Sequence, residues 1–302
     1  MTGALAPPLA AGLAVAALSG AIVLQSARDT WYPRGDSDRT RVLYVRSPAV
    51  MKRMTFGFQA LAADVYWIRA LQHYGGDRLR KQPLPDGRKY ELLYPLLDIA
   101  TSLDPYFNIA YRFGAIFLGE PYPGGAGRPD QAVALLRKGI AAVPTRWQYY
   151  HDIAFVYYWR VRDYKAAALW FQRAAEQPNA PNWLPSVAAS MLTRTGDRAT
   201  ARFMWQQLLG SEQVWIRRTA ERSLLQLQAL EQIDRLQAVV ATAGPPPAGG
   251  YSWSVLVARG RLAGVPLDPA RTPYDIDPLT GRVQVSRQSP LFPMPDTSER
   301  PQ

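Results

Sequence analysis

The chain lacks cysteine altogether and has only two histidines among its 302 residues. The absence of cysteine excludes disulfide bonds, thiolate metal sites, iron–sulfur clusters and cysteine nucleophiles. Two histidines are too few for a histidine-rich metal site. Lysine is also scarce, because five lysines stand beside 30 arginines, and the formal net charge is +11. A hydrophobic content of 48% excludes disorder for most of the chain and leaves ample material for a packed core.

Charged residues are missing from residues 4–24, a run of 21 residues built largely from Ala, Leu, Val, Ile and Gly. As a helix this run would be about 31 Å long, which is enough to cross a bilayer core. The sequence therefore predicts a transmembrane anchor in residues 1–27 and a juxtamembrane linker in residues 28–54. A cleaved signal peptide, with small residues at Ser26 and Ala27 near the cut, and a buried helix are the alternatives.

Basic residues follow this segment and none precedes it. Arg28, Arg34, Arg39 and Arg41 all lie on its C-terminal side. The positive-inside rule then favours a cytoplasmic position for the globular part.

Apolar residues recur three and four positions apart through residues 55–210, which predicts amphipathic helices. Second helices carry a small residue, a bulky residue and another small residue on one face, as in Ala132, Leu136 and Gly139 before Pro144. First helices carry a tyrosine four residues before an alanine. The residues that we expect to pack the repeats are Tyr66, Ala70, Tyr111, Ala115, Tyr150, Ala154, Ala132, Ala167, Ala174 and Ala201.

This pattern resembles the tetratricopeptide repeat, a helical hairpin of about 34 residues with small residues at fixed places and a terminal proline. The resemblance covers residues 61–209, about half of the chain. It implies an all-α solenoid of helical hairpins. The segments ADVYWIRALQHYGG (63–76) and LLDIATSLDPYFNIAYRFGAIF (96–117) are similar to a group of bacterial membrane-anchored tetratricopeptide proteins. That similarity implies a single-pass protein of the bacterial inner membrane. It also implies that the globular part lies in the periplasm, whereas the arginines after the segment favour the cytoplasm.

In this repeat family the concave groove is lined by first-helix residues at set positions. The resemblance carries these positions over as candidate partner-binding residues: Arg112, Ile116, Gln148, His151, Phe155, Tyr158, Trp159, Trp183, Ser186 and Arg194, with Ser190 and Thr193 on the last helix. Aromatic residues and arginine are enriched at interface hot spots, and an arginine can clamp a carboxylate in bidentate fashion. The alternative is that Phe155, Tyr158 and Trp159 pack against the adjacent repeat or the C-terminal tail.

After the repeats, residues 211–243 keep the helical period and predict one or two capping helices, which a solenoid needs to stay soluble. A partner-binding coiled coil is the alternative. Residues 244–302 read as an extended, Pro-rich tail. Within it, residues 251–264 predict a helix that docks on the solenoid, and residues 274–285 predict a small hairpin around a Pro-Leu-Thr-Gly turn.

The hairpin region is similar to one short motif of the type II secretion pseudopilins, in which this region lies beside a calcium site. The similarity would make Asp268, Asp275 and Asp277 oxygen donors. A purely structural hairpin is the simpler interpretation.

Residues that could carry catalysis are few. His73 follows the first-helix tyrosine motif, and His151 stands beside Asp152, although neighbours in sequence are not expected to face each other on a helix. The glycine-rich segment PYPGGAGRP (121–129) lacks the Lys and Ser/Thr of a phosphate loop. The sequence thus predicts no enzyme, no cofactor and no metal site. The scattered positive charges argue against a nucleic-acid partner.

These features together predict a membrane-anchored scaffold that binds protein partners, membrane-complex or envelope components, through its groove. The pseudopilin similarity suggests an envelope, secretion or pilus-type assembly. The alternative is a stably bound accessory subunit of a larger membrane complex, whose Pro-rich tail wraps a neighbouring subunit.

The orientation in the membrane can be tested with a reporter fused after Gln302. We expect alkaline phosphatase activity, because the resemblance places the globular part in the periplasm. The matching fusion to a fluorescent protein that folds only in the cytoplasm serves as the control. Fluorescence without phosphatase activity would show that the arginines after residue 27 set the opposite orientation.

Overall fold

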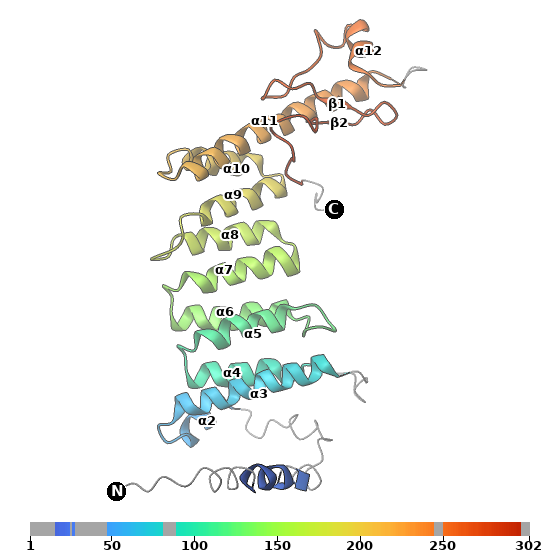
Figure 1. Ribbon diagram of the computed structural model, residues 1–302. Helices are drawn as coiled ribbons and strands as arrows, with labels where there is room; N and C mark the ends of the chain where they lie inside the picture. The colour runs from blue at the N-terminus through green and yellow to red at the C-terminus, as the bar shows by residue number, and fades with distance from the viewer. Residues whose placement is uncertain (1–15, 25, 28–46, 81–88, 245–249, 297–302) are drawn as a thin grey trace, which may run out of the picture. The chain divides into compact units, whose positions relative to one another are not determined.

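The computed structural model describes residues 16–24, 26–27, 47–80, 89–244 and 250–296 (Figure 1). These residues are mostly helical, and their only sheet is a pair of two-residue strands. The predicted all-α class is therefore confirmed. Backbone contacts divide the chain into two units, one of residues 1–104 with 123–126 and the other of residues 105–122 with 127–302. Each unit is described below by itself.

The predicted anchor lies largely outside the described residues. Residues 16–24 and 26–27 are helical and exposed, and residues 1–15 are not described. No helix in the described ranges combines the length and the apolarity that a membrane crossing requires. Within the predicted linker, residues 28–46 are also outside the described residues, and the end of the linker forms helix α2 (Pro48–Met54).

The first unit contains α2, α3 (Gln59–Leu79) and α4 (Leu93–Leu103). Pro48 opens α2, and the Ser47 hydroxyl accepts a hydrogen bond from the N–H of Val50 as its N-cap. The long helices α3 and α4 pack as a hairpin, and Ala63, Tyr66 and Ala70 of α3 are buried. Helix α3 continues through Gly75 and Gly76 to Leu79.

Two buried polar side chains of α3 fix the start of α4. His73 Nε2 accepts a hydrogen bond from the N–H of Leu92 at 3.2 Å, and Asp77 accepts one from the N–H of Tyr90 at 2.6 Å. Both side chains are nearly inaccessible to solvent. A buried backbone N–H without a partner would be costly, so these two bonds favour this one approach of the chain to α4.

The second unit begins with three further helical hairpins, each helix packing on the next in sequence (Figure 1). A π-helical turn, η2, directly extends α7. The elements are α5 (Asn108–Gly119), α6 (Pro129–Ala142), α7 (Trp147–Val156) with η2 (Tyr157–Val161), α8 (Tyr164–Ala175), α9 (Leu184–Thr195) and α10 (Arg198–Leu208). With α3 and α4 of the first unit, four helical hairpins therefore lie within residues 55–210 of the described chain, where the sequence predicts helical repeats.

Turn residues explain where these helices begin and end. Asp163 and Asp197 are the N-caps of α8 and α10, and each carboxylate accepts a hydrogen bond from the N–H three residues later. Gly196 ends α9 in the left-handed conformation that favours glycine. Pro129 occupies the first turn of α6, where its missing N–H costs nothing.

Small residues allow the helices of this unit to approach closely. Gly139 of α6 lies between two buried tyrosine rings, and a Cβ atom there would stand 3.0 Å from Tyr149 and 3.1 Å from Tyr111. The two rings are 5.3 Å apart between centroids. The predicted small positions Ala115, Ala132, Ala154, Ala167, Ala174 and Ala201 are all buried.

The buried tyrosine of α7 is not the predicted Tyr150 but its neighbour Tyr149. Tyr149 is fully buried, whereas Tyr150 is only partly buried and donates a hydrogen bond to the carbonyl of Pro144. Tyr150 therefore does not fill the inter-helix space that the sequence assigns to it.

Residues 211–243 form one long helix, α11 (Val214–Thr242). It packs on α10, and two ion pairs join these helices: Arg198 with Asp234, and Arg202 with Glu231, each at 2.5 Å. Its second half carries the tail. Trp253 and Leu256 of α12 (Trp253–Ala258), together with Tyr274, Val283 and Leu291, form a core with Leu236 and Val240 of α11.

The tail is therefore folded, and the prediction of an extended segment is wrong for residues 250–296. The predicted hairpin is present as β1 (Asp275–Ile276) and β2 (Val283–Gln284), paired antiparallel. Gln237 of α11 holds this hairpin, since it donates to the carbonyl of Gly281 and accepts from the N–H of Val283. The helix predicted over 251–264 is shorter and packs on α11.

The close approach at Gly139 predicts the cost of adding one methyl group. Gly139→Ala should lower the free energy of unfolding by about 1–3 kcal/mol, because the fully buried rings of Tyr111 and Tyr149 cannot move aside. Gly119→Ala on α5 is the control, since a Cβ there would meet its nearest atom at an ordinary 3.7 Å. Urea unfolding followed by circular dichroism compares the two, and equal midpoints would show that the glycine is not required for packing.

Candidate functional site

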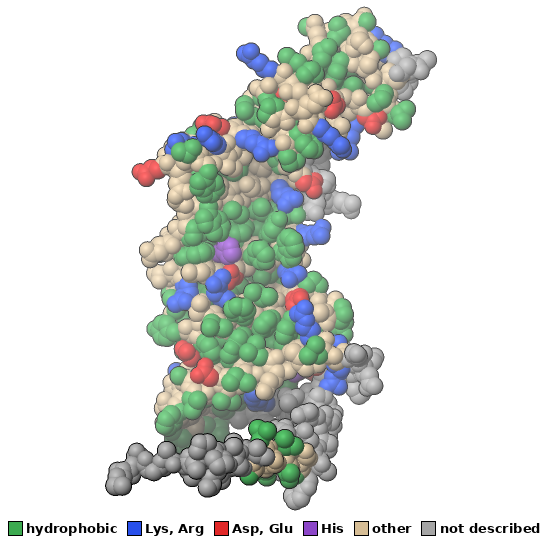
Figure 2. All heavy atoms as spheres, viewed as in Figure 1, with side chains coloured by type: hydrophobic (Ala, Val, Ile, Leu, Met, Phe, Trp, Pro, Cys, Tyr) green, Lys and Arg blue, Asp and Glu red, His purple; other side chains and the backbone are tan. Residues whose placement is uncertain are grey.

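A row of aromatic side chains runs along one face of α7 and η2. Trp147, His151, Phe155 and Trp159 follow one another four residues apart, the spacing that places side chains on one helix face. The rings of His151 and Phe155 are stacked with centroids 6.4 Å apart, and those of Phe155 and Trp159 with centroids 6.2 Å apart. We call these four residues the aromatic row. Figure 2 shows hydrophobic side chains gathered on one face of the molecule over α5 and α7.

The end of the aromatic row depends on the π-helical turn. After Val156 the helix widens over five residues and closes at Arg162, which adopts a left-handed conformation. The wider turn keeps Trp159 above Phe155, and their ring planes differ by only 10°. π-Helical turns occur frequently at functional sites. Phe155 is 47% exposed and Trp159 is 56% exposed, so neither the adjacent repeat nor the described part of the tail covers them.

A cavity of about 210 Å³ opens between α5 and α7, beside the aromatic row. The small residues Ala115 and Gly119 of α5 leave this space free. Arg160 of η2 borders it, and its Cγ would lie 3.7 Å from a Cβ placed on Gly119. The other lining residues are Arg112, Ile116, His151, Asp152, Phe155 and Val156. The exposed Phe113 of the same helix adds to the apolar surface.

Asp152 joins two of the predicted site residues at the wall of this cavity. Its carboxylate accepts hydrogen bonds from Arg112 Nε at 2.5 Å and from Arg112 Nη2 at 3.2 Å, and lies 3.0 Å from His151 Nδ1. The hydrogen bonds to the carboxylate raise the pKa of Arg112 above its ordinary value. The Arg112 side chain is 38% exposed, so the ion pair contributes at most about 1 kcal/mol to stability. Its main effect is to orient both side chains.

This geometry corrects one expectation. His151 and Asp152 were expected to point apart as neighbours on a helix, yet their side chains meet. The pair lacks a nucleophile nearby, because no hydroxyl side chain is among the described residues that line the cavity. The arrangement can bind and orient a ligand, and nothing in it supplies a nucleophilic step.

The cavity collects four of the predicted groove residues: Arg112, Ile116, His151 and Phe155. Tyr158 and Trp159 extend it through ring contacts with Phe155, and Trp183, at the N-terminus of α9, contacts the edge of His151. Gln148 is partly buried on α7. Ser186 does not belong to the groove, since it is buried and donates to the carbonyl of Trp183 at 2.7 Å. The sequence reasoning missed Asp152, Arg160 and Gly119.

Comparison of the chain with protein-family models, with curated proteins and with solved structures finds no match.

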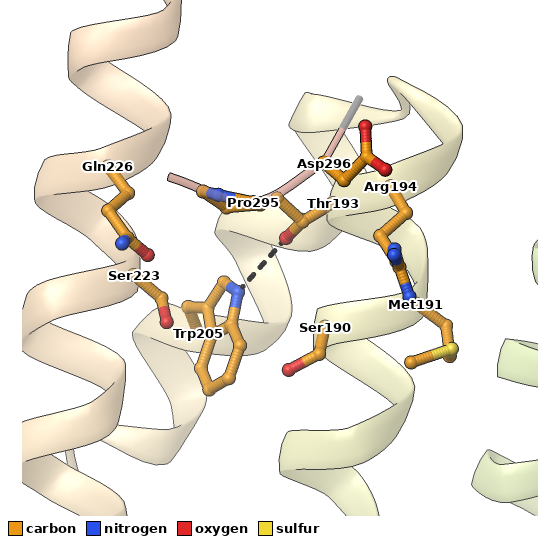
Figure 3. A pocket seen from close by; sticks show the side chains of 9 residues that line it. All are labelled: Ser190, Met191, Thr193, Arg194, Trp205, Ser223, Gln226, Pro295 and Asp296. Atoms are coloured by element: carbon orange, nitrogen blue, oxygen red, sulfur yellow. Dashed lines mark hydrogen bonds between the residues drawn. The ribbon is translucent and has the colours of Figure 1, made fainter. Parts of the chain in front are cut away.

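Arg194, the last predicted groove residue, lies in a different place. It lines a pocket of about 290 Å³ between α9, α10 and α11, with Ser190 and Thr193. Figure 3 shows the tail residues Pro295 and Asp296 in this pocket, between Gln226 of α11 and Arg194. Trp205 forms the floor and donates a hydrogen bond to Thr193 at 3.4 Å. The Arg194 guanidinium stands over the ring of Tyr164 at 5.0 Å. The end of the tail therefore borders the α9 end of the predicted groove.

Two of the three carboxylates that the pseudopilin similarity would make calcium ligands accept hydrogen bonds from nearby backbone N–H groups. Asp268 accepts hydrogen bonds from the N–H groups of Ala270 and Thr272 and from the Ser289 hydroxyl. Asp277 accepts from the N–H groups of Leu279 and Thr280, and these bonds lower its pKa. Asp275 is exposed on β1. The described residues contain no group of three or more side chains placed to hold a metal ion. The geometry supports the structural interpretation of the hairpin.

The hydrogen bonds of Gln226 hold the end of the tail on α11, and a substitution there tests how much they contribute. Its side-chain amide donates to the carbonyls of Leu291 at 2.8 Å and Pro293 at 2.9 Å. Gln226→Ala should release residues 291–296 and speed tryptic cleavage after Arg287 by about tenfold, since the Pro293 carbonyl loses its donor and the Leu291 carbonyl keeps only the 3.5 Å bond from Arg222. Gln228→Ala, an exposed glutamine on the same helix, is the control. Equal cleavage rates in both variants would show that the core around Tyr274 holds the tail without this amide.

Proposed function

We propose that the chain is a membrane-anchored scaffold of the tetratricopeptide type, which binds a segment of a protein partner in the groove between α5 and α7. The hairpin architecture supports this proposal, because it matches the expected arrangement of first and second helices. The N-terminal uncharged run would hold the scaffold at the bacterial inner membrane with the repeats in the periplasm. An envelope, secretion or pilus-type assembly is the setting that the tail motif favours.

The exposed aromatic row is the observation that carries the proposal. Phe155 and Trp159 leave large apolar surfaces in water, and burial of such surface stabilises a complex by about 25 cal/mol per Å². Stacking fixes both rings before a ligand arrives, so little side-chain entropy is lost on binding. Tryptophan and tyrosine are also the residue types that dominate interface hot spots.

The chemistry of the cavity limits the ligand. Its wall is mostly apolar and receives an apolar side chain, whereas two guanidinium groups stand at its border. Arg112 donates from Nε and Nη2 to Asp152, so this edge of its guanidinium is not open to a second carboxylate. Arg160 forms no ion pair with any carboxylate of the described residues. We therefore expect an extended segment with an apolar anchor residue followed by an acidic group.

The tail weighs against the accessory-subunit alternative. That hypothesis required the tail to wrap a neighbouring subunit, but residues 250–296 pack on α11 of their own chain. The groove between α5 and α7 is left as the partner-binding surface.

Truncation of the aromatic row tests the proposal. Phe155→Ala should lower capture of the partner from detergent-solubilised membranes at least tenfold, since a hot-spot side chain contributes about 2 kcal/mol or more to binding. The free energy of unfolding should change by less than about 1 kcal/mol, because the ring is half exposed. Phe203→Ala, an exposed phenylalanine on the second helix α10, is the matched control. Equal capture by the two variants, or no partner with the native chain, would contradict the proposal.

A further inference from the structure

Helix α3 is apolar on two opposite faces. One face, with Ala63, Tyr66 and Ala70, is buried in the hairpin with α4. The other face exposes Leu61, Val65 and Ile68, which are 62%, 48% and 51% accessible. The spacing of four and three residues places these three side chains in one stripe. A helix that is apolar all round is normally covered on both sides, so this stripe calls for a second apolar environment.

The junction between α2 and α3 exposes further apolar side chains. Met54, Phe56 and Phe58 are 56%, 89% and 70% exposed. Phe56 and Gly57 both have positive φ angles, of 45° and 97°, and form the tight turn that leaves these side chains in solvent. A phenylalanine in this conformation is strained. We call the exposed side chains of residues 54–68 with Lys52 and Arg53 the α2–α3 surface.

Positive charge accompanies the apolar stripe. Lys52 and Arg53 lie in the last turn of α2 and are exposed. Residues 47–80 contain five basic and two acidic residues; Asp77 is buried, and Asp64 is exposed beside Val65. Apolar side chains bordered by lysine and arginine are the composition of helices that lie in the interface of anionic bilayers.

We propose that the α2–α3 surface lies on an anionic lipid bilayer. Its apolar side chains would enter the boundary between headgroups and acyl chains, and Lys52 and Arg53 would contact lipid phosphates. The inference rests on the membrane attachment in the proposed function, since the uncharged run of residues 4–24 precedes this surface by only 22 residues of sequence before Ser47. A second copy of the chain is disfavoured as the occupant, because two cationic surfaces would repel each other.

The absence of cysteine makes a direct test simple. Val65→Cys in the full-length chain carries a single environment-sensitive fluorophore, and Lys165→Cys on the exposed side of α8 carries the control label. Both proteins are reconstituted into vesicles of phosphatidylcholine and phosphatidylglycerol that contain a lipid with a nitroxide on its acyl chain. We expect the label at residue 65 to shift to shorter wavelength and to lose most of its emission to the nitroxide. The label at residue 165 should keep its emission. Adding Lys52→Glu and Arg53→Glu should reduce the quenching at residue 65 severalfold.

Each other outcome overturns the inference. Vesicles that float with the protein but leave residue 65 unquenched would overturn it and leave the membrane anchor standing. If the label at residue 65 shifts to shorter wavelength without quenching, and shows the same shift in detergent, another segment of the chain covers the stripe. Energy transfer between copies labelled with donor and acceptor, without quenching, would identify a second copy as the occupant. Protein that does not float would overturn both this inference and the membrane attachment.

Discussion

The second unit depends on how closely its helices can approach at a few small side chains. At Gly139 the backbone of α6 stands against the edges of two tyrosine rings, one from α5 and one from α7, with no room for a methyl group. The rings fill the space that the missing side chain leaves, so three helices share one contact. Because protein interiors are packed to the density of crystals, the positions of α5 and α7 are set by this contact to within a fraction of an ångström.

The candidate site is a consequence of that packing. The faces of α5 and α7 that turn away from α6 are held side by side, but Ala115 and Gly119 are too small to fill the space between them. Small residues thus have opposite effects at the two places. Gly139 allows close contact at α6, whereas Ala115 and Gly119 leave a cavity between α5 and α7. Asp152 then holds Arg112 and His151 at the rim, and the π-helical turn brings Trp159 onto Phe155. The site is already arranged before a ligand binds, which lowers the entropy cost of binding.

Local sequence signals predicted much of this fold. Helical period and proline stops are each decided by neighbouring residues, and the hairpins lie within the range that those signals indicate. The exchange of Tyr150 for Tyr149 could not be predicted, since both lie on the same helix and only the position of Gly139 decides which ring is buried. The core that the tail forms with α11 was missed for a similar reason. The tail's apolar residues are too few for a core of their own, and the second half of α11 supplies the missing side. The contact between His151 and Asp152 was not expected, because the Cβ atoms of neighbouring residues on a helix point in different directions. The two side chains are nevertheless long enough to meet.

The two exposed apolar surfaces differ in ways that separate their functions. The aromatic row consists of stacked, oriented rings next to a cavity and a fixed carboxylate–guanidinium pair, and such preorganised, directional features select one ligand from many. The α2–α3 surface consists of Met, Phe, Leu, Val and Ile side chains with the charged Lys52, Arg53 and Asp64, and it discriminates by polarity and charge. A lipid bilayer demands no more than that, because its interior has no fixed shape to match. A protein partner that must be chosen among others requires the first kind of surface. The tail narrows that choice further, since Pro295 and Asp296 border the pocket at the α9 end of the predicted groove, whereas no tail residue lines the cavity between α5 and α7.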